Sequence, residues 1–122
     1  MLRYLHVRFK SFGYAMAGLL FLLKSEPHAR IHLLATAVVV IAAIALDVAR
    51  QDWLWLTVAI TLVWVVEAIN TAIEHLCDVV SPEHSQNVRR AKDVAAGAVL
   101  IAAIAAMTIG IIVFYPFIRA LI

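Results

Sequence analysis

The sequence has few residues that crosslink or break a polypeptide chain. It contains one cysteine, Cys77, with four glycines and three prolines among 122 residues. A single cysteine excludes an intramolecular disulfide, and we interpret Cys77 as a small buried apolar side chain. Charged residues are also scarce, at 15% of the chain, and the net charge is only +2. This mild balance gives no basis for nucleic-acid binding, and we expect no nucleic-acid partner.

Several phosphate-binding motifs are also missing. The chain has no G-x-x-x-x-G-K-[ST] loop, no G-x-G-x-x-G turn and no H-R-D catalytic loop. These absences exclude a P-loop or a protein-kinase fold as the means of binding a nucleotide. No cysteine and histidine spacing indicates zinc. We also expect no cleavable signal peptide, because no short apolar core is followed by a small-residue cleavage site.

Apolar side chains, in contrast, make up 65% of the chain, and the mean hydropathy is +0.96. A soluble protein of this length could not bury so much apolar surface, so a lipid bilayer is its expected solvent. We predict one all-α membrane domain over residues 1–122, with transmembrane helices at 28–48, 53–77 and 93–116. A polar turn over 47–52 separates the first two, and Pro116 is expected at the frayed end of the third.

The basic residues predict the orientation of the chain. Most of them lie before the first span or between the second and third: Arg3, Arg8, Lys10, Lys24, Arg30, Arg89, Arg90 and Lys92. Only Arg50 and Arg119 fall on the other side. The positive-inside rule therefore places the N-terminus and the 79–92 loop in the cytoplasm.

Residues 1–25 differ from the spans because their apolar side chains form a single stripe. The stripe repeats at steps of three and four residues, as in an amphipathic helix: Leu2, Leu5, Phe9, Phe12, Met16, Leu19 and Leu23. We predict a helix on the inner membrane surface, and a helix packed on a protein partner remains the alternative.

Three helix starts are predicted from local signals. Pro27 fits the first turn of the helix that follows the surface helix, where its missing N–H costs nothing. Ser81, with Pro82 after it, is expected to cap a short helix, and Asp93 is expected to cap the third span.

Four polar side chains interrupt the end of the second apolar run, at Glu67, Asn70, Glu74 and Asp78. At ~100° per residue they fall within roughly 80° of one another, so they form one stripe, which we call the polar row. Counted from Trp53 at the outer interface, Glu67 lies ~21 Å deep and Glu74 ~31 Å deep. Because the hydrocarbon core is ~30 Å thick, the polar row crosses the inner interface.

A carboxylate inside the hydrocarbon costs on the order of 2.5–3.5 kcal/mol at the membrane centre, which makes Glu67 a functional candidate. Lipid hydroxyls lie at its depth, and a carboxylate removed from water is a suitable general base for one. Glu74 and Glu26, nearer the water, suit a hard cation, and with Lys92 they are similar to an apparatus for a magnesium nucleotide. The alternatives are a packing pair for Glu67 and an interfacial cation for Lys92.

The segments EAINTAIEHLCD (67–78) and RRAKDVAAGAVL (89–100) carry a further signal. On these segments the chain resembles the bacterial integral-membrane diacylglycerol kinases, a family that includes undecaprenol kinases. That family has an E-x-x-N-[ST]-A-I-E-x-x-x-D stretch, followed by A-K-D and small residues. Both motifs are present here at the family's separation, and the match covers nearly the whole chain.

The resemblance implies a homotrimer in the bacterial inner membrane, each chain having three spans and a surface helix. Such a protein transfers the γ-phosphate of ATP to a membrane lipid alcohol, using Mg²⁺, at sites shared between neighbouring chains. The resemblance implies Glu67 as the catalytic base, and Glu26 and Glu74 as metal ligands. Nucleotide contacts are implied at Tyr14, Glu26, Glu74, Glu83, His84, Ser85, Lys92 and Asp93. Supporting or substrate-facing roles are implied for Asn70, Asp78, Arg30 and Ala96.

Three positions depart from the enteric diacylglycerol kinases. Tyr14 is followed by Ala-Met-Ala-Gly where those enzymes continue with a serine and Trp-Lys-Gly. His32 stands where they have an acidic residue, and Val7 stands where they have an arginine, so that Arg8 or Lys10 must substitute or the contact is lost. The segment ARIH (29–32) is closer to the undecaprenol kinase branch, and we lean slightly to undecaprenol over diacylglycerol as substrate.

We therefore expect in-line phosphoryl transfer, in which Glu67 accepts the proton of the lipid hydroxyl and Lys92 offsets charge on the transferred group. The rival hypothesis is a non-enzymatic membrane bundle, such as a small transporter or assembly subunit, with the polar row as an ion path or packing seam. It predicts no ATP use and leaves the cytoplasmic concentration of Glu26, Glu74 and Lys92 unexplained.

Overall fold

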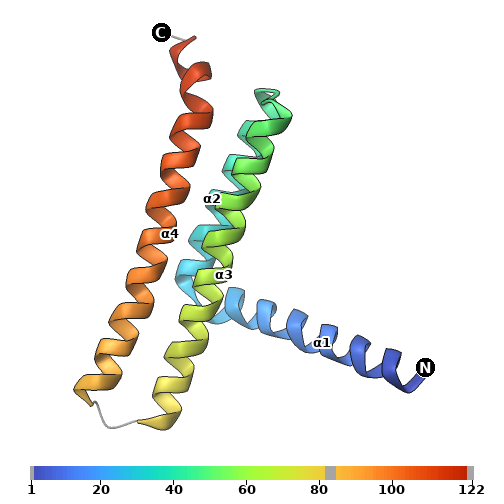
Figure 1. Cartoon of the computed structure of the whole chain (residues 1–122), viewed down its shortest axis with the longest axis vertical. Coiled ribbons are helices and arrows are strands. Elements are labelled where there is room, and N and C mark those ends of the chain that lie inside the picture. Colours follow the sequence, from blue (N-terminus) through green and yellow to red (C-terminus); the bar gives the residue numbers. More distant parts are fainter. Residues whose placement is uncertain (1, 82–84, 121–122) are drawn as a thin grey trace.

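The structure is a computed structural model that describes residues 2–81 and 85–120, with side chains from residue 8 onward. This part of the chain forms four helices: α1 (Leu2–Ser25), α2 (Pro27–Ala45), α3 (Arg50–Val80) and α4 (Gln86–Arg119). Figure 1 shows α2, α3 and α4 running together as a bundle, while α1 projects sideways from it. The predicted all-α architecture is confirmed.

The bundle helices α2, α3 and α4 are each long and apolar enough to cross a membrane. Their outward surface carries large exposed apolar side chains, among them Ile41, Leu54 and Ile101. A helix satisfies its backbone hydrogen bonds within the segment, as the hydrocarbon interior requires. The predicted set of three membrane-spanning helices is therefore confirmed, and the exposed apolar surface is the part that meets lipid or other chains.

The best-packed core lies where α2 turns into α3. Ala43, Val48, Leu56 and Val113 are buried together there, surrounded by Val39, Trp53, Ile109, Phe114 and Phe117. In lipid, helices associate through packing and hydrogen bonds because burial of apolar surface supplies little driving force between them. This end of the bundle therefore fixes how the three helices lie against one another, and the polar row lies toward the opposite end of α3.

The corner between α1 and α2 is held by backbone and side-chain hydrogen bonds. Pro27 occupies the first turn of α2, as predicted, and Glu26 before it has extended backbone with φ −103° and ψ 115°. Arg30 reaches back from α2 and donates to the carbonyl oxygens of Leu23, at 3.1 Å, and Lys24. Because the last carbonyls of a helix have no partner within it, this guanidinium completes the end of α1. The corner thereby places Glu26 where the two helices meet.

The turn between α2 and α3 is a Schellman motif. The N–H of Val48 donates to Ala43 O at 3.2 Å, and the N–H of Asp47 donates to Ile44 O at 3.2 Å. Asp47 adopts φ 49°, a left-handed conformation that glycine usually provides in this motif. Val48 and Ala43 also belong to the buried core, which is the apolar contact that accompanies such a turn.

We expect Asp47→Gly to raise the free energy of unfolding by up to about 1 kcal/mol, because glycine has no Cβ to strain in the left-handed region. Asp47→Val should lower it by about 1–2 kcal/mol. Denaturant titration of the purified protein in mixed micelles measures both. Equal stability of the two variants would show that this backbone conformation contributes nothing.

Two of the predicted N-caps are wrong. Ser81 is the C-cap of α3 and does not begin a helix. Asp93 lies inside α4, and the cap of that helix is Ser85, whose Oγ accepts from the N–H of Val88 at 3.2 Å. Ser81, Ser85 and Asp93 all carry a side-chain acceptor that could cap a helix, so local sequence does not distinguish among them.

Three smaller differences concern helix ends and burial. The turn before α3 is shorter than 47–52, because Arg50 already begins the helix. α4 continues through Pro116 to Arg119, since a proline this close to the end removes only one hydrogen bond. Cys77 is half-buried rather than buried.

Candidate functional site

The polar row begins at Glu67, whose side chain lies inside the bundle with 3% of the residue exposed. Burial decreases along the row, because Asn70 and Glu74 are half-buried and Asp78 is exposed. A buried carboxylate requires a partner, and Glu67 Oε2 lies 3.7 Å from His32 Nε2 on α2. The row therefore passes from an enclosed acid to the open end of α3.

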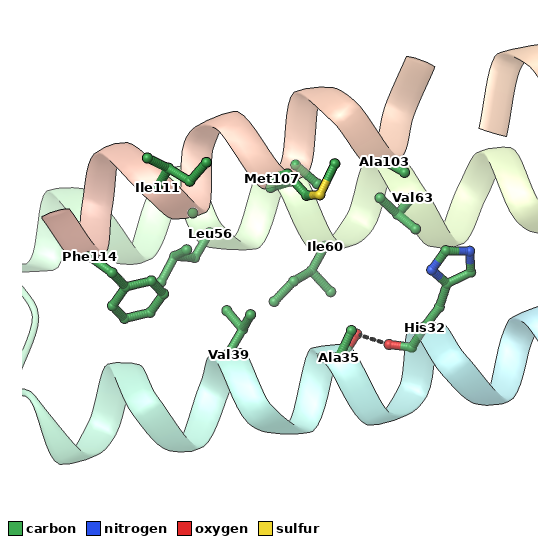
Figure 2. A pocket seen from close by; sticks show the side chains of 14 residues that line it. His32, Ala35, Val39, Leu56, Ile60, Val63, Ala103, Met107, Ile111 and Phe114 are labelled. Carbon is green, nitrogen blue, oxygen red and sulfur yellow. Dashed lines mark hydrogen bonds between the residues drawn. The ribbon is translucent and has the colours of Figure 1, made fainter. Parts of the chain in front are cut away.

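A short chain of hydrogen bonds links α2 to α3 at the level of His32. Thr36 Oγ1 donates to His32 O at 2.7 Å, and Trp64 Nε1 donates to Thr36 Oγ1 at 3.1 Å. Figure 2 shows the first of these bonds and the His32 ring at one end of a cavity between α2, α3 and α4. The residue that departs from the enteric enzymes is thus the partner of the predicted base.

We expect His32→Leu to lower the free energy of unfolding by about 1–3 kcal/mol, because it leaves the buried Glu67 carboxylate without its polar neighbour. Thermal unfolding in detergent measures the loss. The loss should be smaller in the Glu67→Gln background, where no charge is left unpaired. Equal losses in both backgrounds would show that the two side chains are not coupled.

The middle of the polar row presents oxygen atoms. Asn70 Nδ2 donates to Glu74 Oε1 at 3.2 Å, which orients both side chains along one face of α3. Within the described residues, Asn70 Oδ1 and Thr71 Oγ1 are buried without a hydrogen-bond partner. Buried acceptors without a partner are rare, so these two atoms are candidates for contact with a ligand, an ion or water.

The α1–α2 corner meets α3 beside Glu74. Glu26 Oε1 lies 3.9 Å from His75 Nε2, and the His75 ring packs against Phe21 of α1 with 5.1 Å between ring centroids. The structure therefore brings both predicted metal ligands to one level of the bundle. Over residues 2–81 and 85–120, however, no three His, Cys, Asp or Glu side chains are grouped closely enough to hold a metal ion.

The end of the polar row opens into a polar pocket of about 690 Å³ between α3 and α4. Its lining comes from the last turn of α3 and the first turns of α4: Asp78, Ser81, Ser85, Gln86, Val88, Arg89 and Lys92. Lys92 Nζ donates to Asp78 Oδ1 across the pocket. Lysine, arginine and hydroxyl donors around an open cavity are suited to a phosphorylated ligand.

Several predicted residues lie away from this site within one chain. Tyr14 is on α1 and exposed, Asp93 and Ala96 are exposed on α4, and Arg30 is bound to the end of α1. Tyr14 lies ~18 Å along its helix from Glu26 at 1.5 Å per residue. Glu83 and His84 are outside the described residues. The structure therefore brings together Glu67, Asn70, Glu74 and Asp78 of α3, with Lys92 of α4 and Glu26 at the corner.

Several residues of the site were not predicted as site residues from the sequence, among them His32, whose Nε2 lies 3.7 Å from Glu67. His75 and Thr71 lie on α3 beside the polar row, and Gln86 and Arg89 line the polar pocket. His75 directly follows Glu74. Arg89 and Arg90 form a basic pair that also indicates the orientation of the chain in the membrane. Their neighbours in the sequence were a signal for these residues. Their contacts, however, depend on how the helices pack against one another, which sequence periodicity does not specify.

Comparison with known proteins decides the class. A model of the family described as prokaryotic diacylglycerol kinase matches residues 13–114. The chain belongs to that family. Undecaprenol kinase from Bacillus subtilis (strain 168) is 32% identical over 108 residues, which cover 88% of each chain. Diacylglycerol kinase from Escherichia coli (strain K12) is 36% identical over 98 residues, which cover 80% of each chain. Diacylglycerol kinase from Synechocystis sp. is 38% identical over 101 residues, or 82% of this chain and 58% of that protein.

Family membership confirms the predicted class of lipid kinase, and with it the use of ATP. It decides against the non-enzymatic bundle. The polar row and the polar pocket are consequently the place to look for the chemistry.

Proposed function

We propose that this chain transfers the γ-phosphate of ATP to the hydroxyl of a membrane lipid alcohol, with Glu67 as the general base. The observation that carries the proposal is the continuity of the polar row. One face of α3 joins a carboxylate enclosed among apolar helices to a polar pocket lined by Lys92 and Arg89. A lipid hydroxyl reaches the Glu67 carboxylate from the membrane, and a nucleotide reaches the polar pocket from water.

The reaction needs a base, and Glu67 suits that role by its position. It lies at the depth where a lipid exposes its hydroxyl, and His32 at 3.7 Å orients its carboxylate. Glu67 accepts the proton as the alcohol oxygen forms a bond to the γ-phosphorus, and the bond from that phosphorus to the β-phosphate oxygen breaks. Holding both substrates at one interface supplies much of the rate.

The polar pocket is the proposed nucleotide site. Lys92 directs positive charge toward the phosphates, and Asp78 of α3 holds its ammonium beside the polar row. Asp78 and Glu74 are one helical turn apart on α3. The phosphates of a nucleotide in the pocket therefore extend along the polar row toward Glu67. Ser85 and Arg89 add donors at the entrance.

The donor set of the polar row fits Mg²⁺, a hard cation that prefers carboxylate and amide oxygens. Glu26 and Glu74 would hold it, with the unpaired Asn70 Oδ1 facing the same region of α3. When bound, the ion neutralises charge on the ATP phosphates. His75, 3.9 Å from Glu26, keeps that carboxylate beside α3.

Undecaprenol is our preferred substrate over diacylglycerol. The relative from Bacillus subtilis named undecaprenol kinase shares 88% of its length with this chain. The segment ARIH (29–32), which is similar to the undecaprenol kinase branch, supports the same choice. Relatives named diacylglycerol kinase are also similar, so the substrate is decided by assay.

We further propose a homotrimer in the bacterial inner membrane, with α1 on the cytoplasmic surface and active sites shared between chains. The basic residues support that orientation. Tyr14 on the projecting α1, and Asp93 and Ala96 on the exposed face of α4, are positioned to complete the site of a neighbouring chain. The exposed apolar surface of the bundle is available for that contact.

The test is a kinase assay on the purified full chain in detergent micelles. The protein is incubated with magnesium and ATP, in parallel with undecaprenol and with diacylglycerol, and phosphorylated lipid is measured. We expect product with both Mg²⁺ and ATP present, and more from undecaprenol. Absence of product from either lipid would overturn the proposal, and a preference for diacylglycerol would overturn the choice of substrate.

A further inference from the structure

A cavity of about 350 Å³ lies inside the bundle between α2, α3 and α4. Its lining is apolar apart from His32 and Thr36, and Figure 2 shows His32 at one end and Phe114 at the other, with Val39 and Ile60 between them. Met107 and Ile111 border the cavity and are largely exposed, so it opens sideways from the bundle. An apolar cavity that opens sideways from a membrane helix bundle is fit for a hydrocarbon ligand.

One end of the cavity lies next to the proposed general base. His32 lines the cavity, and its Nε2 lies 3.7 Å from the Glu67 carboxylate, which is buried behind it. The lining residues of α3, from Leu56 to Val63, lie ~6–16 Å farther along the helix than Glu67, toward the α2–α3 turn. A lipid alcohol with its hydroxyl at Glu67 extends its chain in the same direction, away from the cytoplasm.

We infer that this cavity binds the hydroxyl-proximal segment of the polyprenyl chain during phosphorylation. The inference rests on the proposed function and identifies which part of the protein selects the lipid. An apolar cavity of ~150 Å³ holds one benzene, so about 350 Å³ holds on the order of fourteen carbon atoms, or two to three isoprene units.

The size and lining favour one prenyl chain over a pair of acyl chains. Two acyl chains side by side would fill the cavity with a shorter length of each chain, so only the carbon atoms nearest the hydroxyl would fit. Small residues, among them Ala59, Ala106 and Gly110, form part of the wall and leave room for the methyl branches of a prenyl chain. At Gly110 an added Cβ would meet no atom within 4 Å, so the adjacent space is open.

The test fills the cavity at Gly110. A Gly110→Leu substitution places a side chain in open space, ~10 Å along α4 from Ala103 at the His32 end of the cavity, and it should favour the helix because glycine is a poor helix former. We expect kcat/KM for undecaprenol to fall at least tenfold, mainly through KM. The KM for ATP, and the rate with a five-carbon prenyl alcohol too short to reach Gly110, should change less than twofold.

A matched control is Thr108→Leu, which adds apolar volume to an exposed position on the opposite face of the same helix. It should leave both lipid rates unchanged. Undecaprenol activity equal to wild type in Gly110→Leu would overturn the inference, as would an equal loss with the short alcohol or a raised KM for ATP. If wild type phosphorylates neither alcohol, the proposed function fails instead.

A second measurement is independent of turnover. A prenyl alcohol carrying benzophenone at its third isoprene unit, bound to the wild-type protein in micelles and irradiated, should label residues between 103 and 114 of α4. Undecaprenol should compete with the labelling and excess phospholipid should not. Competition by phospholipid would assign the cavity to ordinary membrane lipid, and labelling confined to other segments would place the chain elsewhere; either result overturns the inference.

Discussion

Glu67→Gln should reduce lipid phosphorylation by about 10²–10⁴-fold or more, because a general base contributes a factor of that size and the amide cannot accept the proton. The replacement has nearly the same shape, and it removes a charge from the apolar interior, so folding and assembly should be preserved. Initial rates in detergent micelles with saturating ATP measure the loss. The binding of ATP should change little, since Glu67 lies two helical turns from the level of Glu74.

The controls separate a chemical defect from a structural one. Thr57→Val changes a polar side chain on the same helix outside the polar row, and it should keep wild-type activity. Size-exclusion profiles of wild type and Glu67→Gln should coincide. Wild-type activity in Glu67→Gln would end the assignment of the base, whereas a loss accompanied by altered assembly would point to packing.

Lys92→Met should lower kcat by about 10²–10³-fold, the usual effect of removing one preorganised group that stabilises developing charge. The side chain lies in the polar pocket and is bound to Asp78, so it is already oriented before the nucleotide arrives. Methionine keeps the apolar stem and removes only the ammonium. The KM for the lipid should stay within about twofold, because the proposed lipid site is at Glu67, the other end of the polar row.

Arg90→Met is the matched control for this prediction. Arg90 is an exposed cation on the same turn of α4 and is not part of the pocket lining. Its removal should leave kcat within about twofold. A comparable loss in both variants would show that the general positive charge of this end of the bundle matters, and not the placement of Lys92.

The sequence was sufficient for the helices and for the polar row. Apolar runs of bilayer length admit few structures other than spanning helices, and the 3.6-residue period places Glu67, Asn70, Glu74 and Asp78 on one face whatever surrounds them. The depth of each residue follows from helix rise alone. The burial of Glu67 and the exposure of Asp78 agree with that estimate.

What required the structure was the pairing between helices. His32 and Glu67 are far apart in the sequence, and their contact depends on how α2 rotates against α3. The same holds for Glu26 with His75 and for the cavity beside Gly110. Helix ends were also uncertain, since Ser81, Ser85 and Asp93 each carry a suitable capping group and only one of them begins α4.

The length of α3 has a consequence for how substrates are distinguished. The helix has 31 residues and spans ~46 Å, well beyond a hydrocarbon core of ~30 Å, as one uninterrupted rod. Under the proposed function, this straight helix keeps a constant distance along the membrane normal between the lipid hydroxyl and the nucleotide. We therefore expect the protein to distinguish lipids by how far below the headgroups their hydroxyl lies, and we expect turnover to depend on bilayer thickness.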